Sequence, residues 1–152
     1  MSKNPPSPQP KVAATTKSRW FYLCVFIIFA IALFFILNFR FFITSGPSME
    51  PTYTEGTFII SFRLHGQPKV DDVVMLYWNN KVCMKRVAFV AGEDVSAAGY
   101  EGYWGSSIVP EGYVYVLGDN PDHSNDSRNP DFGLVAIENI WGKPLAQREK
   151  RN

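Results

Sequence analysis

Thr44-Ser-Gly-Pro-Ser-Met-Glu-Pro-Thr-Tyr53 is the stretch that divides the chain into an apolar first part and a β-type second part. Its two prolines, Pro47 and Pro51, each fix φ and remove a backbone donor, so neither a helix nor a central strand fits here. We expect a stiff loop that holds the hydroxyl of Ser48 in a set direction. Taken alone, a Gly-Pro turn with an idle serine is the simpler interpretation, and only later stretches argue against it.

An uncharged segment of 18 residues, from Trp20 to Leu37, precedes this loop and is followed by Arg40 and a further apolar patch. As a helix it spans roughly 27 Å at 1.5 Å per residue, close to the ~30 Å hydrocarbon core of a bilayer. Trp20 and Tyr22 suit one membrane interface, and Arg40 suits the other. The sequence therefore predicts a transmembrane helix over residues 20–43.

A secretory signal peptide is the alternative for this segment, but its apolar region has about 7–15 residues and ends in an A-x-A-like site. The segment here is longer, and residues 38–48 offer no such site. Residues 1–19 predict a disordered tail with four basic residues and no acid, namely Lys3, Lys11, Lys17 and Arg19. This positive charge predicts a single span with a cytoplasmic N-terminus and an extracytoplasmic domain after residue 43.

The charge of the chain is divided unevenly between this tail and the rest. Subtracting the tail's four basic residues from the total of 15 leaves 11 against 14 acidic residues, a net charge of −3. A mildly acidic domain without a basic stripe argues against nucleic acid as a partner. Two distant cysteines and two scattered histidines form no zinc pattern, so we expect no disulfide, no metal and no cofactor: Cys24, Cys83, His65 and His123.

Beyond the loop, short runs rich in β-branched and aromatic residues alternate with clusters of Gly, Pro, Asn and Asp. This spacing predicts a mainly β fold, a small antiparallel domain over residues 44–147 that is closed or nearly closed like a β-barrel. A short C-terminal tail, residues 148–152, follows it. Residues 96–110 predict a hairpin or surface loop. The predicted strands are residues 57–62, 72–78, 82–90 and 113–117.

The third of these strands carries a lysine between apolar neighbours. With an alternation of two, Cys83, Lys85 and Val87 share one face, and burial there would lower the pKa of the Lys85 amine. Arg86 would act in the same direction if its guanidinium lies close. A neutral lysine can accept a proton from a serine. Taken alone, a solvent-facing lysine on an edge strand is the simpler interpretation.

The polar stretch over residues 117–133 is too dense in turn formers for a strand and predicts a loop. Its spaced carboxylates suggest a calcium loop: Asp119, Asp122 and Asp126. Counted from Asp119, however, the third, fifth, sixth and twelfth positions lack the residues that an EF-hand requires. We expect instead that Asp126 and Arg128 form an ion pair that braces the loop, with Ser124 available to bond a neighbour.

These stretches, in this order after a membrane anchor, resemble the signature boxes of type I signal peptidases (leader peptidases). Residues 45–52 resemble the nucleophile box. Lys85-Arg-Val-Ala-Phe-Val-Ala-Gly-Glu-Asp94 resembles the base box, with Phe89 in place of a glycine, Ala91 in place of a proline and one acid shifted. Residues 69–76 resemble a Gly-Asp-Ile-Val-Val-Phe strand, with Asp71 where the glycine usually lies. Gly118-Asp-Asn-Pro-Asp-His-Ser-Asn-Asp-Ser-Arg128 resembles the last box almost throughout.

The resemblance implies a membrane-anchored serine endopeptidase that removes N-terminal signal peptides from exported preproteins after small residues, at Ala-x-Ala sites. It implies that Ser48 is the nucleophile and Lys85 the general base of a Ser/Lys dyad, with Ser124 orienting the lysine. The other supporting residues are Asp126, Arg128 and Arg86. The family's β-rich domain binds the substrate as an added extended strand. Candidates for the substrate pocket are Phe42, Met49, Tyr53 and Met84.

One departure from the family's pattern concerns the oxyanion. Many bacterial members carry a serine two residues before the nucleophile, where this chain has Gly46. The backbone N–H of Ser48 is one candidate donor, and the hydroxyl of Ser45 or a loop-bound water is the second. The Gly-Pro-Ser-Met form resembles the mitochondrial inner-membrane branch, whereas the last box resembles bacterial members. The expected location is the cytoplasmic (inner) membrane of a cell, with the mitochondrial inner membrane as the alternative.

Other functions remain possible for such a sequence. A specialised processing peptidase of a conjugation or secretion system would use the same dyad on fewer substrates. A self-cleaving repressor should carry a DNA-binding helix-turn-helix instead of a span. A non-catalytic, anchored β-barrel binding module would be favoured by loss of Ser48 or Lys85, and both residues are present.

Overall fold

The computed structural model describes residues 16–63 and 66–149, with side chains described from residue 19 onward. Two compact units, residues 1–37 and residues 38–152, are described separately below. Most of the predicted N-terminal tail (residues 1–15) and the end of the predicted C-terminal tail (residues 150–152) lie outside the described residues.

The first unit contains helix α1, Thr16–Asn38, whose side chains are exposed from Arg19 to Leu37. By length and composition it could cross a membrane. Two predicted boundaries are wrong, because α1 begins inside the predicted tail and ends at Asn38 instead of residue 43. The aromatic run Phe39–Ile43 is strand β1, which pairs residue by residue with the next strand, as suits aromatic and β-branched side chains.

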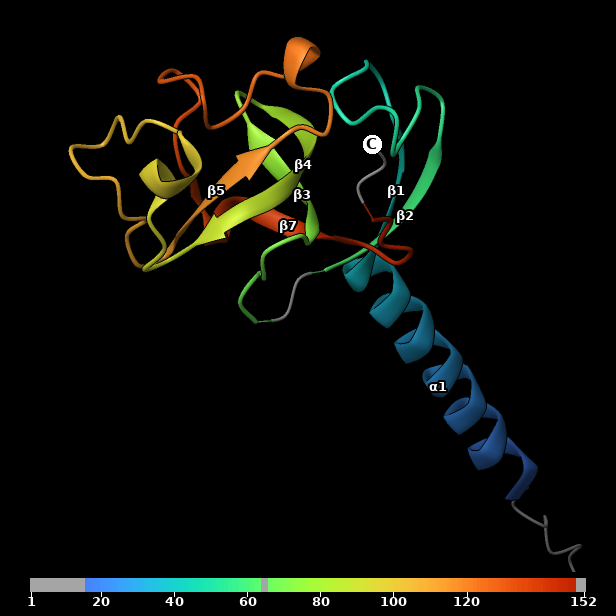
Figure 1. Cartoon of the computed structure of the whole chain (residues 1–152). Coiled ribbons are helices and arrows are strands. Elements are labelled where there is room, and N and C mark those ends of the chain that lie inside the picture. Colours follow the sequence, from blue (N-terminus) through green and yellow to red (C-terminus); the bar gives the residue numbers. More distant parts are fainter. Residues whose placement is uncertain (1–15, 64–65, 150–152) are drawn as a thin grey trace, which may run out of the picture. The chain divides into compact units, whose positions relative to one another are not determined.

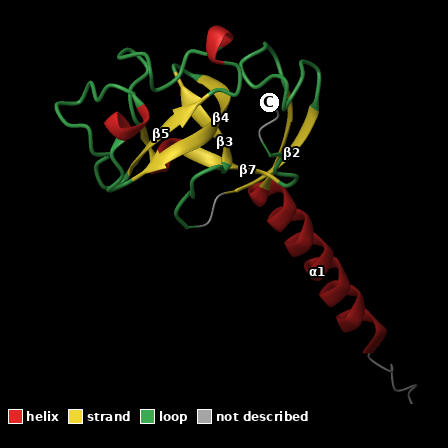
Figure 2. Cartoon of the chain, in the orientation of Figure 1, coloured by secondary structure: helices red, strands yellow, loops and turns green. Residues whose placement is uncertain are grey.

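The second unit is an antiparallel sheet of seven strands in the order β1-β2-β7-β3-β4-β5-β6 (Figure 1). Figure 2 shows these strands in yellow, joined mostly by loops. The mainly β, antiparallel fold is confirmed, but the sheet does not close, since β1 and β6 are its edges within the described residues. Its strands are β1 Phe39–Ile43, β2 Phe58–Arg63, β3 Val73–Trp78, β4 Lys81–Val90, β5 Tyr113–Leu117, β6 Val135–Ala136 and β7 Ile140–Pro144.

A tight hairpin between β3 and β4 fixes the register of the lysine strand. Asn79 and Asn80 have φ values of 47° and 60°, the geometry of a two-residue hairpin turn that asparagine tolerates well. In the resulting register Val74 lies opposite Lys85. Because Val74 is fully buried, this pairing carries the side chain of Lys85 into the interior.

Among the described residues, the core consists of three groups of buried side chains. The largest lies along β3, β4 and β5. In the second, Met49 and Tyr53 of the loop after β1 pack against Ile59 and Val73, so this predicted loop is anchored in the core. The third holds the excursion between β4 and β5, which includes the short 3₁₀ helix η1, Val95–Ala98. Two further 3₁₀ helices are η2, Pro121–His123, and η3, Ile137–Asn139.

Candidate active site

Ser48 lies in consecutive turns between β1 and β2. The Glu50 N–H donates to the Pro47 carbonyl at 3.0 Å, and the Tyr53 N–H donates to the Met49 carbonyl at 2.8 Å. These short-range hydrogen bonds, together with the fixed φ of Pro47 and Pro51, stabilise the loop that the sequence predicts here. The side chain of Ser48 is half-buried, so it is neither lost in the core nor fully in solvent.

Two further contacts define the approach to Ser48. Gly46 has a φ of 83°, a left-handed conformation that residues with side chains rarely adopt. The carbonyl of Ser48 accepts a hydrogen bond at 3.1 Å from the N–H of Asn120, which lies in the loop after β5. The turns around Ser48, residues 47–53 (the serine turn), are therefore bonded directly to the loop that resembles the last signature box.

Lys85, on β4, is buried with 4% of its surface exposed, and its Nζ donates to the Ser124 hydroxyl at 2.9 Å. Burial is the main reason that the pKa of its ammonium is lowered. The charges of Asp126 and Cys83 act against this, whereas Arg128 lowers the pKa of Lys85 further. The fold thus favours the neutral amine that a general base requires.

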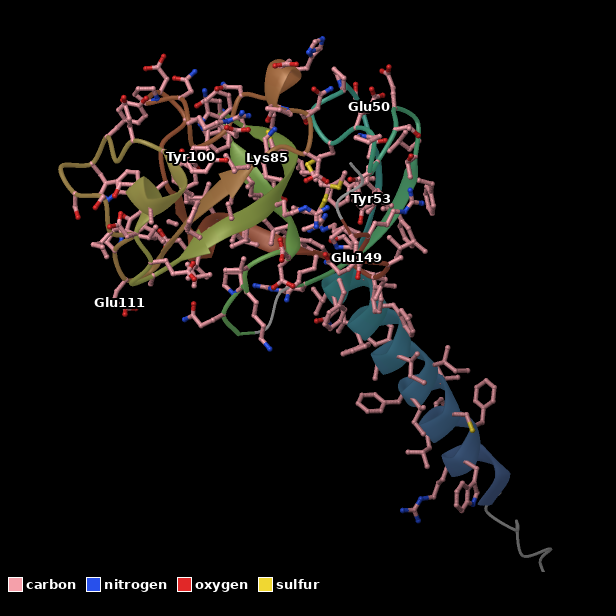
Figure 3. All side chains as sticks on the ribbon, in the orientation of Figure 1. Glu50, Tyr53, Lys85, Tyr100, Glu111 and Glu149 are labelled. Carbon is pink, nitrogen blue, oxygen red and sulfur yellow. The ribbon has the colours of Figure 1, made fainter. Side chains whose placement is uncertain are left out.

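Ser48 and Lys85 line one pocket of about 150 Å³. Figure 3 labels Lys85 on β4 and Tyr53 in the loop between β1 and β2. Within the described part of the chain, no hydrogen bond joins Ser48 Oγ to Lys85 Nζ. Such bonds are often absent before substrate binds, so the dyad stays a prediction. The other predicted pocket and oxyanion residues also line this pocket: Phe42, Ser45, Met49, Tyr53 and Met84.

The predicted ion pair of Asp126 and Arg128 is present. Arg128 donates to the two carboxylate oxygens at 2.8 and 2.6 Å, and Asp126 is 1% exposed. Burial alone would raise the pKa of Asp126, but hydrogen bonds from Arg128, the Gly118 N–H and Ser124 outweigh it, so the pKa is lowered. Asp126 is therefore held as a carboxylate behind Ser124.

Arg86, a predicted supporting residue, forms an ion pair that the sequence did not indicate. Its guanidinium forms a bidentate pair with Asp119, at 2.8 and 2.7 Å, and both side chains are buried. Arg128 is the cation that lowers the pKa of Lys85. An influence of Arg86 was expected only if its guanidinium lay close to the lysine, and this guanidinium is bound to Asp119 instead. Arg86 also donates to the carbonyl of Asp71 at 3.0 Å. Asp71 has a φ of 70°, a conformation that explains why a glycine suits this position.

Three adjacent residues at the start of the stretch that resembles the last box were given no role in the catalytic site from the sequence: Gly118, Asp119 and Asn120. A Cβ on Gly118 would lie 2.5 Å from the Ser48 carbonyl oxygen and would collide with the Ser124 side chain. The glycine thus allows the serine turn and the lysine's partner to approach each other. The available signal was a Gly-Asp-Asn run directly after a strand.

The carboxylates that suggested a calcium loop have other partners. Asp119 is paired with Arg86, and Asp126 with Arg128. Asp122 is exposed on η2. Among the described residues, no group of His, Cys, Asp or Glu side chains is placed to hold a metal ion.

Comparison with known families agrees with this arrangement. Residues 17–103 and 97–146 match the family described as signal peptidase, peptidase S26. The chain belongs to this peptidase family. Its members are hydrolases, and the resemblance inferred from the signature boxes is confirmed.

Relatives come from both organelles and bacteria. Mitochondrial inner membrane protease subunit 1 of Schizosaccharomyces pombe is 35% identical over 116 residues, which cover 68% of this chain and 69% of the relative. Mitochondrial ATP-independent inner membrane protease subunit 1b of Arabidopsis thaliana is 34% identical over 110 residues, 66% of this chain and 64% of the relative. Signal peptidase I of Bacillus caldolyticus is 26% identical over 162 residues, 82% of this chain and 86% of the relative.

Proposed function

We propose that this chain is a membrane-anchored serine endopeptidase that cleaves N-terminal signal peptides from exported preproteins after small residues, at Ala-x-Ala sites. One observation carries the proposal. A half-buried serine, Ser48, and a buried lysine with a lowered pKa, Lys85, line the same pocket. Together with membership of the peptidase S26 family, this pair supports acyl transfer by a Ser/Lys dyad.

In the proposed reaction the neutral amine of Lys85 takes the proton of Ser48 as Oγ attacks the carbonyl carbon of the scissile bond. Ser124, whose hydroxyl accepts from Nζ at 2.9 Å, orients the amine. The Ser48 N–H and the Ser45 hydroxyl donate to the oxyanion. Lys85 then returns the proton to the departing amine, and later takes one from the water that hydrolyses the acyl-enzyme.

The surroundings of the pocket support a substrate bound as an extended strand. Edge strand β1 leads into it, and Phe42, Ile43 and Thr44 contribute to its lining. An edge strand offers unpaired backbone groups for a further strand. A volume of about 150 Å³ favours small side chains at the cleavage site. Helix α1 would hold the enzyme in the bilayer, either the cytoplasmic membrane of a cell or the mitochondrial inner membrane.

The test incubates detergent-solubilised protein with a preprotein that ends its signal peptide in Ala-x-Ala. We expect one new N-terminus directly after the second alanine, as determined by sequencing the product. A matched preprotein with Phe at that alanine should stay uncleaved, because the pocket is small. Cleavage by Ser48→Ala protein, or equal cleavage of both preproteins, would contradict the proposal.

A narrower processing role is the second candidate. The similarity to a numbered subunit of a mitochondrial inner membrane protease favours it, because that name indicates an assembly. A panel of unrelated preproteins distinguishes the two candidates. Cleavage of most of them indicates a general signal peptidase, and cleavage of one or two indicates a dedicated enzyme.

A further inference from the structure

A segment near the end of the sequence binds the serine turn. After β7, residues 146–149 (the strap) contact residues that lie 93 to 96 positions earlier. The Tyr53 hydroxyl donates to the Ala146 carbonyl at 3.0 Å and accepts from the Arg148 N–H at 3.1 Å. The Arg148 guanidinium donates to the Thr52 carbonyl at 3.2 Å and lies 5.0 Å from the centre of the Tyr53 ring. The strap therefore holds this tyrosine at its hydroxyl and over its face.

The strap is itself fixed to the sheet. The side-chain amide of Gln147 accepts from the Val73 N–H at 2.7 Å and donates to the Val73 carbonyl at 3.0 Å, so it takes the place of a neighbouring strand. The Arg148 carbonyl accepts from Arg86 at 3.1 Å, and the same Arg86 nitrogen donates to Asp119 at 2.7 Å. Arg148, the first residue of the predicted C-terminal tail, is thus bonded to the domain.

Tyr53 connects the strap with the nucleophile. It is 1% exposed, lines the pocket with Ser48 and Lys85, and closes the serine turn through its N–H. On the other side of the turn, the Ser48 carbonyl accepts from Asn120, the neighbour of Asp119. The strap consequently reaches Ser48 along two short chains of contacts, one through Tyr53 and one through the Arg86 ion pair.

We propose that Arg148 is a positioning residue for Ser48, acting through Thr52 and Tyr53. The proposal rests on the peptidase function proposed above. Arg148 is exposed and is not part of the pocket lining, so it does not act on the substrate directly. It acts by fixing the position of the Ser48 hydroxyl, because a displacement of about 1 Å at a reacting group can lower the rate roughly 10²-fold.

The kinetic test compares Arg148→Ala with Arg148→Lys and with Arg63→Ala, a matched removal of an exposed arginine at the end of β2. We expect Arg148→Ala to lower kcat at least tenfold, with KM changed less than twofold and the thermal midpoint close to that of Arg63→Ala. Arg148→Lys should restore much of kcat, because a lysine keeps a donor for the Thr52 carbonyl and a cation over the ring. Parental kcat in Arg148→Ala overturns the proposal, as does a loss that the unfolded fraction explains.

Hydrogen exchange tests the strap without any substrate. We expect the Tyr53 and Asn120 amides, which bond across the serine turn, to exchange faster in Arg148→Ala than in the parental protein. Arg63→Ala should leave both rates unchanged. If the parental protein cleaves no preprotein, the proposed function fails, yet faster exchange at these amides still supports the strap. Unchanged exchange overturns it whatever the cleavage result.

Discussion

The two sides of the candidate site are held in different ways. On the lysine side, polar and charged side chains bond one another, with Lys85 on Ser124 and Asp126 on Arg128. On the serine side, backbone turns and buried apolar side chains fix the loop, and no hydrogen bond from the described residues reaches the Ser48 hydroxyl. The fold therefore fixes the amine of the proposed base, Lys85, whereas the hydroxyl of the proposed nucleophile, Ser48, remains available for a substrate.

The two sides meet at the loop after β5. Gly118 lets the Ser48 carbonyl and the Ser124 side chain come close, and Asn120 bonds that carbonyl. The loop after β5, which carries neither Ser48 nor Lys85, thus contacts both sides of the candidate site. This arrangement makes the comparison testable, because each side can be disturbed separately.

Removing either reactive group should have the largest effect. We expect Ser48→Ala and Lys85→Ala each to lower kcat/KM by at least about 10³, since nucleophile and base act as a unit. Lys85→Arg should also be inactive, because a guanidinium does not release its proton near neutral pH. Circular dichroism checks that the fold is kept. Appreciable cleavage by either alanine variant would remove the dyad from consideration.

The next largest effect should come from Gly118, where the loop after β5 meets the serine turn (the junction). Disturbing it should lower kcat about 10²-fold. We expect this loss for Gly118→Ala, because its Cβ would lie 2.5 Å from the Ser48 carbonyl oxygen and push nucleophile and base apart. Gly142→Ala is the matched control, since its Cβ would collide with the Phe62 carbonyl between β2 and β7, outside the pocket lining.

Both glycine variants should lose stability in a thermal unfolding assay. Only Gly118→Ala should lose kcat once rates are corrected for the folded fraction. Equal corrected rates for the two proteins would show that the junction does not set the geometry of the site.

Features that depend on residues close together in the chain were predicted well from the sequence. Alternation along residues 82–90 placed Lys85 beside apolar neighbours, and the spacing of Asp126 and Arg128 allowed an ion pair within one loop. These features depend on residues close in the chain, so their physics is visible in the pattern. The four strand predictions agree with β2, β3, β4 and β5 to within one residue at each end.

Features that depend on distant parts of the chain were missed. Nothing near Arg86 indicates that its partner is Asp119, because the register of β4 and β5 brings them together. The end of α1 was missed for a similar reason, since Phe39–Ile43 is apolar apart from Arg40, which suits a membrane interface, and its pairing with β2 is not visible in the local pattern. The pairing of Arg148 with Tyr53 likewise joins opposite ends of the domain.

On the serine side, removal of the proposed second oxyanion donor, the Ser45 hydroxyl, should lower kcat about tenfold or more. We expect Ser45→Ala to lower kcat with little change in KM, as for a contact made mainly in the transition state. Ser45 lies at the pocket wall beside Gly46. Gly46→Ser is a poor reverse test, because a φ of 83° strains any side chain there. A parental rate in Ser45→Ala would assign the second donor to a bound water.

On the lysine side, the smallest effects are shifts of the pH profile, and their signs are opposite. Because the proposed base is the neutral amine, kcat/KM should rise with pH through the lowered pKa of Lys85. Asp126 raises the pKa of Lys85, so Asp126→Asn should move this rise to lower pH. Arg128 lowers the pKa of Lys85, so Arg128→Gln should move the rise to higher pH, by a smaller amount.

A linked measurement checks the same lysine without substrate. The unfolded chain binds the Lys85 proton more tightly than the folded one, so stability should rise with pH between the lowered pKa and the ordinary value of about 10.4. In Lys85→Met this contribution should disappear, since the side chain no longer titrates. Urea unfolding of the parental and Lys85→Met proteins across that range measures it. If the difference in their stability does not vary with pH, the pKa of Lys85 is not lowered, and the opposite shifts expected for Asp126→Asn and Arg128→Gln lose their basis.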